Sequence, residues 1–230
     1  MASRNGSWKC ISNPMWIVFI IFVLFPYVPY LGRYISLGTE VVIWSLFALG
    51  FNILLGYTGL PSFGHGAFFG IGAYAAGIFF LRVYKGLWIP LIMSILITGF
   101  FASLVGLLVA KKRGIYFALI TIAITQVFYF VALRWEELTG SDTGLLGIDR
   151  VDIGFTHLFR IKLSTPINYY YFVLVIFILC TLLIWRIVHS PFGKVLQGIR
   201  ENEVRASYLG YHTATYKWKA FTISGLFAGL

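Results

Sequence analysis

Four polar side chains lie inside a glycine-rich apolar stretch, FNILLGYTGLPSFGHGAFFGIGAYAAG at residues 51–77, where they could contact a polar solute crossing a membrane. They are Asn52, Thr58, Ser62 and His65. The stretch lies between segments hydrophobic enough to span a bilayer, and irregular backbone at that depth is tolerated only where protein or a water-filled cavity satisfies its polar groups. Each side chain could hydrogen-bond either to a zwitterionic solute in transit or only to the irregular backbone of its own stretch. For His65 a local capping role is favoured, so Asn52 and Ser62 are the better candidates for a translocation path.

A second polar set lies on the apolar stretch at residues 114–133. Thr121 and Thr125 are four residues apart, on one face of a helix, and Gln126 follows directly. Hydroxyl groups of this kind also join membrane helices, for roughly 0.6 kcal/mol per hydrogen bond. We favour that role for Thr121 and retain Thr125 and Gln126 as candidate path residues. Small residues with helical spacing predict close helix packing nearby, at Gly66, Gly70, Ala73 and Gly77.

A charged loop at residues 188–217 is unusual for a connector between apolar segments. Ser190 and Pro191 form a helix start signal, and Gly210 is a plausible helix stop. The loop therefore predicts a short amphipathic helix pair, which could lie on the membrane surface or sit in a groove of a partner protein. Its mixed charges favour the protein partner. The residues that we assign to this contact are Arg200, Glu201, Asn202, Glu203, Arg205, Ala206 and Gly210.

Catalytic and metal-binding patterns are not evident in the sequence. The four histidines fall on different segments, without an acidic residue at triad or metal-ligand spacing. The two cysteines suggest neither a disulfide framework nor a metal site. No GxxxxGK[ST] motif is present, so ATP binding by a P-loop is not expected. We therefore expect no catalytic residues, no metal site and no cofactor in this chain, and we do not expect it to be an enzyme.

Composition defines the elements that must position these residues. Of 230 residues, 59% are apolar and 11% charged, and the mean hydropathy is +0.85, whereas soluble domains carry about 25% charged residues. The sequence predicts an all-α polytopic bundle of transmembrane helices in the lipid bilayer, with a broken or re-entrant glycine-rich segment. The net charge of +10 is spread between apolar segments without a nucleic-acid-binding pattern, so nucleic acid is not an expected partner. Apolar windows lie at residues 15–31, 35–55, 66–82, 87–110, 114–133 and 168–187, with an incomplete seventh from 218.

Charge distribution predicts the orientation of the bundle. With a cytoplasmic N-terminus, eleven of the eighteen basic residues lie inside and seven outside, as the positive-inside rule favours. Residues 1–14 are then a cytoplasmic tail, and residues 15–230 form one transmembrane domain. The loop at residues 134–167 becomes external and could dock a partner or serve only as a connector. Residues 220–230 are apolar but too short to span, so the last helix is truncated or the chain is a fragment.

Four stretches in the same order resemble permease subunits of ABC importers for branched-chain amino acids, of the LivM type. They are GFNILLGYTGLPSFGHGAFFGIGAYAAG, RGIYFALITIAITQVFYFVAL, LTGSDTGLLGI, and SPFGKVLQGIRENEVRASYLGY followed by KAFTISGLFAGL. Importers generally carry E-A-A, three residues and Gly in their coupling loop. Aligned on Gly210, this chain keeps Ala206 but has Val204 and Arg205 before it.

The resemblance implies that residues 15–230 are a permease domain of the cytoplasmic membrane and that residues 200–210 dock in a cleft of a separate ATPase subunit. It also implies a similar second permease subunit in a heterodimer, an extracytoplasmic substrate-binding protein, and ATP bound by the partners. Two alternatives stay open: a permease for urea or another small amide, and an ion-coupled carrier or channel that needs no ATPase. A membrane scaffold without transport is a third.

Overall fold

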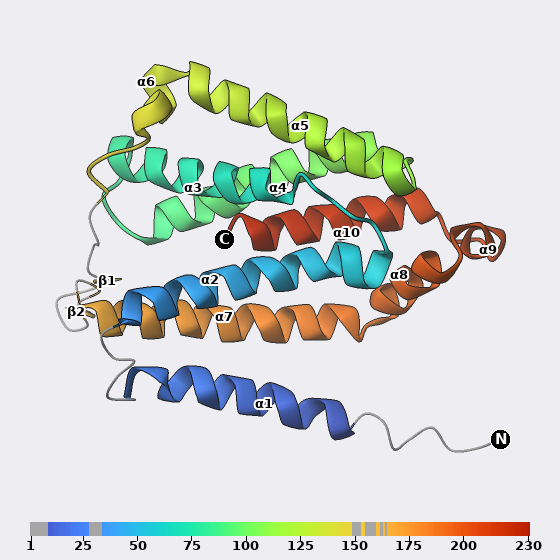
Figure 1. The fold of residues 1–230 in the computed structure, drawn as a ribbon, viewed down its shortest axis with the longest axis horizontal. Helices are drawn as coiled ribbons and strands as arrows, with labels where there is room; N and C mark the ends of the chain where they lie inside the picture. Colours follow the sequence, from blue (N-terminus) through green and yellow to red (C-terminus); the bar gives the residue numbers. More distant parts are fainter. Residues whose placement is uncertain (1–8, 28–33, 149–152, 155–159, 162, 164) are drawn as a thin grey trace.

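The computed structural model describes residues 9–27, 34–148, 153–154, 160–161, 163 and 165–230 (Figure 1). The α-helices are α1 (Lys9–Leu24), α2 (Ile35–Asn52), α3 (His65–Arg82), α4 (Trp88–Val109), α5 (Gly114–Arg134), α6 (Glu136–Thr139), α7 (Pro166–Val188), α8 (Pro191–Glu201), α9 (Glu203–Tyr208) and α10 (Thr213–Ala228). Short 3-10 turns are η1 (Phe25–Tyr27) and η4 (Ser141–Thr143), and η3 (Ile53–Thr58) is a π-helix. Strands β1 (Ile153–Gly154) and β2 (Arg160–Ile161) form an antiparallel pair. The predicted all-α bundle is confirmed.

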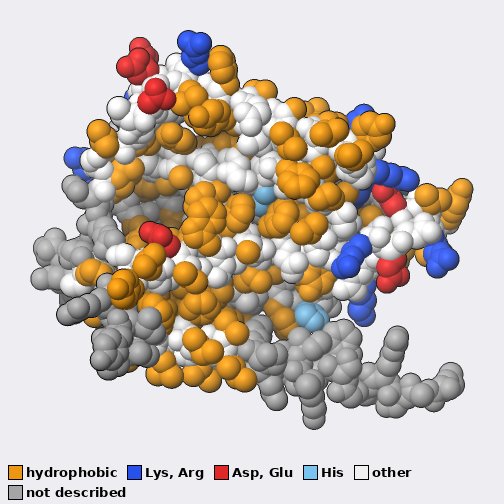
Figure 2. Space-filling view, viewed as in Figure 1, with side chains coloured by type: hydrophobic (Ala, Val, Ile, Leu, Met, Phe, Trp, Pro, Cys, Tyr) orange, Lys and Arg blue, Asp and Glu red, His pale blue; other side chains and the backbone are white. Residues whose placement is uncertain are grey.

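The apolar windows from residue 35 onward each overlap a helix of the bundle, and the described part of the window at residues 15–31 overlaps α1 and η1. Within the described residues, four helical segments are long and apolar enough to cross a membrane: Ile35–Thr58, Trp88–Val109, Gly114–Arg134 and Pro166–Val188. Many of their large apolar side chains are exposed on the outside of the molecule (Figure 2). In a lipid bilayer such side chains need no protein cover, because lipid tails are as apolar as leucine.

Helix α10 lies in the middle of the bundle, with α3 and α4 on one side and α2 and α7 on the other (Figure 1). Small residues allow this close approach. A Cβ atom on Gly225 of α10 would lie 2.4 Å from the Cβ atom of Ala102 on α4. Phe221 of α10 stands edge-on to Phe68 of α3 and Phe117 of α5. The helix that follows the charged loop therefore contributes directly to the core.

The connections divide between the two ends of the bundle. The α8–α9 pair and the α4–α5 turn lie at one end, while α6, η4 and the short strands lie at the other (Figure 1). The backbone carbonyl of Lys112 in that turn accepts a hydrogen bond from the Lys217 ammonium of α10, which fixes these basic segments on the same side. Their common location agrees with the sequence-based prediction that both basic segments lie on the same side of the membrane.

Candidate functional site

Helices α8 and α9 form the helix pair that the sequence predicts. Ser190 precedes α8 with extended backbone, and Pro191 is the first helical residue. The Ser190 hydroxyl does not cap α8, however, because it donates to the Ile187 carbonyl of α7, 2.6 Å away. Between the helices, the Asn202 side chain accepts from the Arg205 amide at 2.9 Å and so caps α9. After α9, Gly210 has a φ of 88°, a conformation that glycine adopts without strain.

The pair has an inner and an outer face. Leu196, Ile199 and Ala206 are buried against the bundle. On the outer side, Tyr208 is 86% exposed and Leu209 71% exposed. Figure 2 shows hydrophobic side chains at the tip of α9, beyond a group of charged ones. The pair thus presents an apolar tip to whatever lies beyond this end of the protein.

Arg200 joins α8 to the end of the α2–η3 segment. Its guanidinium donates to the Gly56 carbonyl in η3. A Cβ atom on Gly59 would lie 3.0 Å from the Cγ atom of Arg200, so the arginine stem runs directly over this glycine. The last turn of α8 and the glycine-rich stretch are in direct contact.

Glu203 joins α9 to two other segments. One carboxylate oxygen lies 2.9 Å from Nε of Arg113 at the start of α5, and the other lies 3.0 Å from Nζ of Lys217 on α10. The Lys217 ammonium, which is 1% exposed, also donates to the Lys112 carbonyl at 3.0 Å. A buried ammonium is tolerated only when it is paired and hydrogen-bonded, and Glu203 supplies that pair.

The structure divides the residues predicted to contact a partner into two groups, those that contact the bundle and those that are exposed. Ala206 is buried, Asn202 caps α9, and Glu203 and Arg200 contact the rest of the chain. Glu201 and Arg205 are exposed. Much of the predicted set therefore attaches the pair to its own bundle, while the exposed apolar tip was not singled out from the sequence.

The glycine-rich stretch breaks the second membrane helix as predicted. Helix α2 widens into η3, where the Thr58 hydroxyl donates to the Ile53 carbonyl at 2.9 Å. Gly59 then adopts a left-handed conformation with φ of 72°. The next residues run back into the bundle before α3 begins, and Figure 1 shows this linker turning inward from the α8 end. We call residues 53–64 the re-entrant segment.

Two contacts fix the inner end of the re-entrant segment. A Cβ atom on Gly64 would lie 2.3 Å from the Thr121 carbonyl oxygen, so the segment packs against the backbone of α5. The next residue, His65, is buried, and its Nε2 lies 3.1 Å from the Ser224 hydroxyl of α10. That hydroxyl donates to the Gly50 carbonyl of α2 at 2.6 Å. His65 is thus buried and bonds across helices instead of capping its own, and its place in the path stays a prediction.

The other candidate path residues do not converge on one cavity. Ser62 is buried, and its hydroxyl makes no hydrogen bond within the described part of the chain. Asn52 is exposed and lines a polar cavity of about 520 Å³ beside Gln197 of α8. Thr125 bonds to the carbonyl four residues earlier, and Gln126 is exposed. Together with buried Thr58, these positions stay predictions as path residues.

The small-residue stripe on α3 only partly packs as predicted. Cβ atoms on Gly66 and Gly70 would meet open space. A Cβ atom on Gly77 would lie 2.7 Å from Cδ1 of Leu145, which is in a loop. The close contact with the α10 end is at Gly72, outside the predicted set, where a Cβ atom would lie 2.4 Å from the Gly229 carbonyl oxygen. Spacing alone identified the helix but not the face that contacts its neighbour.

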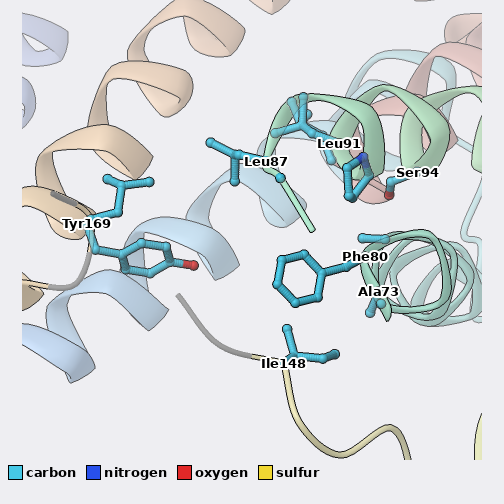
Figure 3. Close-up of a pocket in the computed structure, with 13 residues that line it drawn as sticks. Ala73, Phe80, Leu87, Leu91, Ser94, Ile148 and Tyr169 are labelled. Atoms are coloured by element: carbon cyan, nitrogen blue, oxygen red, sulfur yellow. The ribbon is translucent and has the colours of Figure 1, made fainter. Parts of the chain in front are cut away.

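An apolar cavity of about 410 Å³ lies between α3, α4 and α7, at the end away from α8 (Figure 3). Phe80, Leu87, Ile148 and Tyr169 line it, and the Tyr169 ring points inward. Ser94 adds a hydroxyl that lies 2.6 Å from the Gly229 carbonyl oxygen. The residues that line it do not include the path residues proposed from the sequence.

Lys217, Ser224 and Ser94 are the functional candidates that sequence reasoning missed. Lys217 lies in the first turns of the apolar helix α10, and a lysine at such a position could have indicated a buried ion pair. Ser224 and Ser94 gave no signal, because their partners lie in distant helices. Among the described residues, no group of three or more His, Cys, Asp and Glu side chains could hold a metal ion.

Comparison with known proteins agrees with this architecture. The family described as "Branched-chain amino acid transport system / permease component" matches residues 34–230. The high-affinity branched-chain amino acid transport system permease proteins LivM of Salmonella typhimurium and Escherichia coli are each 29% identical over 215 residues. These alignments cover 85% of this chain and 50% of each relative, so the chain spans about half the length of the curated relatives that it matches. No solved structure matches. Because the family match covers most of the residues, the chain belongs to the permease-component family of branched-chain amino acid transport systems.

Proposed function

We propose that this chain is the membrane-spanning part of an ABC importer that moves branched-chain amino acids across the cytoplasmic membrane. ATP is bound and hydrolysed by separate ATPase subunits, and this chain carries no cofactor of its own. A second permease subunit completes a heterodimer, and an external binding protein delivers the substrate. Family membership supports the class of protein, and the names of the two curated relatives support the substrate.

The observation that carries the proposal is the contact between the α8–α9 pair and the re-entrant segment. Arg200 bonds to the Gly56 carbonyl and covers Gly59. A displacement of α8 would therefore reach irregular backbone that lies within the bundle. This is what an importer driven by an external ATPase requires, because the energy source and the substrate path belong to different polypeptides.

The apolar tip of α9 is the surface that we assign to the ATPase. Val204, Tyr208 and Leu209 are exposed there, and the oppositely charged Glu201 and Arg205 lie nearby. Amphipathic helices dock by placing apolar anchors in a groove with a polar rim. Anionic lipid would favour basic residues alone, so the mixed charges support a protein groove.

The substrate side chain fits the apolar cavity at the opposite end. Its walls are aliphatic and aromatic, with the Ser94 and Tyr169 hydroxyls as polar groups. A branched aliphatic side chain gains from such a lining, whereas urea or another small amide would leave most of its hydrogen-bonding groups unpaired. In the orientation with a cytoplasmic N-terminus, this cavity lies towards the binding protein and α9 towards the ATPase.

Reconstitution of the complete protein tests the proposal. When the protein is reconstituted in liposomes with its ATPase, second permease and binding protein, we expect ATP-dependent uptake of leucine. The Tyr208→Ala/Leu209→Ala variant should lose most of the co-purifying ATPase and the uptake with it. The matched control is Leu146→Ala, which removes a leucine that is 76% exposed at the opposite end and should retain ATPase binding.

Three outcomes would contradict the proposed function. Gradient-driven flux without the ATPase indicates a carrier or channel, and uptake of urea in preference to leucine indicates an amide permease. Retention of the ATPase by the double variant shows that α9 is not its docking surface.

A further inference from the structure

Glu203 lies where three segments of the chain meet. It is the first residue of α9, and its two carboxylate oxygens contact different partners: Arg113 at the start of α5 and Lys217 on α10. Lys217 in turn donates to the Lys112 carbonyl in the α4–α5 turn. A single side chain of the α8–α9 pair therefore holds both the central helix of the bundle and the turn beside it.

The junction is buried on its Lys217 side and open on its Arg113 side. The side chain of Lys217 is 1% exposed, that of Glu203 16% and that of Arg113 56%. Both carboxylate oxygens are occupied by cations of the same chain, so neither is directed towards an external partner. Two positions earlier, Glu201 is exposed and belongs to the outer surface.

The junction also differs in kind from the hydrophobic contacts of the pair. Leu196, Ile199 and Ala206 are buried apolar side chains, and such contacts permit sliding because they have no fixed direction. A carboxylate shared by a guanidinium and an ammonium has defined donors and distances, and charged hydrogen bonds are about twice as strong as neutral ones. Displacement of α9 is therefore passed on at this point in a defined direction.

We propose that Glu203 is the positioning residue that transmits movement of α9 to α10 and to the α4–α5 turn. This inference rests on the proposed function, since it presupposes an ATPase that moves the α8–α9 pair. Helix α10 packs against α2, α3 and α4, so its displacement reaches the helices that surround the apolar cavity. Glu203 acts through Lys217 and Arg113 and touches neither ATP nor the transported solute.

The test measures ATPase binding and coupling separately in the reconstituted complex. We expect Glu203→Gln to retain ATPase co-purification within about twofold while leucine uptake per ATP hydrolysed falls about tenfold, as for the loss of a hydrogen bond between charged groups. The matched control is Glu136→Gln, which removes an exposed carboxylate at the opposite end and should change neither quantity.

In Glu203→Gln the buried Lys217 ammonium loses its carboxylate partner, which could reduce folding and expression. A second variant controls for that effect. Glu203→Gln/Lys217→Met removes both buried charges and should restore folding, because replacing a buried ion pair by uncharged groups is often neutral or stabilising. If its uptake per ATP stays low, the pair is needed for coupling. If uptake per ATP recovers with expression, or if Glu203→Gln never lost it, the pair is only structural and the inference is wrong.

Failure of this inference is distinguishable from failure of the proposed function. If Glu203→Gln loses the ATPase while expression is normal, the carboxylate is a partner contact and only the transmission role fails. If the Tyr208→Ala/Leu209→Ala variant keeps the ATPase, the proposed docking surface fails whatever Glu203 does. Loss of the ATPase in that variant, together with normal coupling in Glu203→Gln, rejects the transmission role alone.

Discussion

The α8–α9 pair and the re-entrant segment meet at Arg200 and Gly56, yet they are fixed mainly by different kinds of contact. The pair is held by a few polar side chains: Arg200 on Gly56, Glu203 on its two cations, and Asn202 at the junction of the helices. The re-entrant segment lacks charged side chains of its own. Its outer end accepts the Arg200 bond at Gly56, and at its inner end the backbone of Gly64 lies directly against that of α5.

Because of this difference, we expect the two regions to tolerate amino-acid substitutions to different degrees. Each polar substitution in the pair removes one directed side-chain contact and leaves the backbone of α8 and α9 in place, so it should change coupling or stability by moderate amounts. Steric contacts between backbones leave no room for adjustment in a close-packed interior. Substitutions in the re-entrant segment should therefore affect the fold itself. The predictions at Gly64 and Asn202 test that division, and a prediction at Ser224 gives the effect of a buried polar contact between helices for comparison.

The largest effect is expected at Gly64. In Gly64→Ala the new Cβ atom would lie 2.3 Å from the Thr121 carbonyl oxygen and 2.5 Å from Oγ1 of Thr125. We expect a loss of about 3 kcal/mol in the free energy of unfolding, the upper end for overpacking, measured by denaturant titration in detergent. Gly66→Ala is the matched control, because its Cβ atom meets open space. Equal stability of the two variants would show that the segment is not sterically fixed.

A smaller effect is expected at Ser224. In Ser224→Ala the hydrogen bond to the Gly50 carbonyl and the contact with Nε2 of His65 are both lost in a buried site. Leaving buried groups unpaired costs about 1–3 kcal/mol. Thr222→Ala provides the control, since that hydroxyl bonds only to the Trp218 carbonyl of its own helix. If the two alanine variants unfold at the same temperature, the inter-helix bond does not stabilise the bundle.

The smallest effect is expected in the α8–α9 pair, at Asn202. Asn202→Ala removes the side-chain oxygen that accepts from the Arg205 amide, and loss of such a cap typically costs about 1 kcal/mol. Asn202→Asp keeps an acceptor and should retain stability. Thermal unfolding measures the difference, and ATPase stimulation reports whether α9 stays positioned. A loss at Asn202 larger than that at Gly64 would reverse the comparison between the regions.

Local signals in the sequence predict much of the pair. The Ser190-Pro191 start and the Gly210 stop are determined by backbone preferences of single residues, and both lie where expected. The division of the pair into faces could not be obtained in this way. Residues 200–206 alternate between inward and outward positions because Asn202 interrupts the helix, which changes the periodicity after it.

Long-range contacts account for the rest. Ser224 lies 159 residues from His65 in sequence, and the two meet only because α10 is inserted between α2 and α3. The same holds for the cavity, whose walls come from α3, α4, α7 and a loop. Hydrophobic windows predict that such helices exist, but they contain no information on which helices are neighbours.

The π-helix at Ile53–Thr58 also makes the length of this part of the chain matter. A π-turn contains one residue more than an α-turn. Deletion of a single residue between 53 and 58 would remove this extra residue and let α2 continue as a regular α-helix, without the widened turn that contains Gly56. The Gly56 carbonyl that accepts from Arg200 belongs to this widened turn, so the deletion should disturb that contact. Insertions and deletions here are therefore more disruptive than most substitutions, and the number of residues in this turn is itself part of the structural information carried by the sequence.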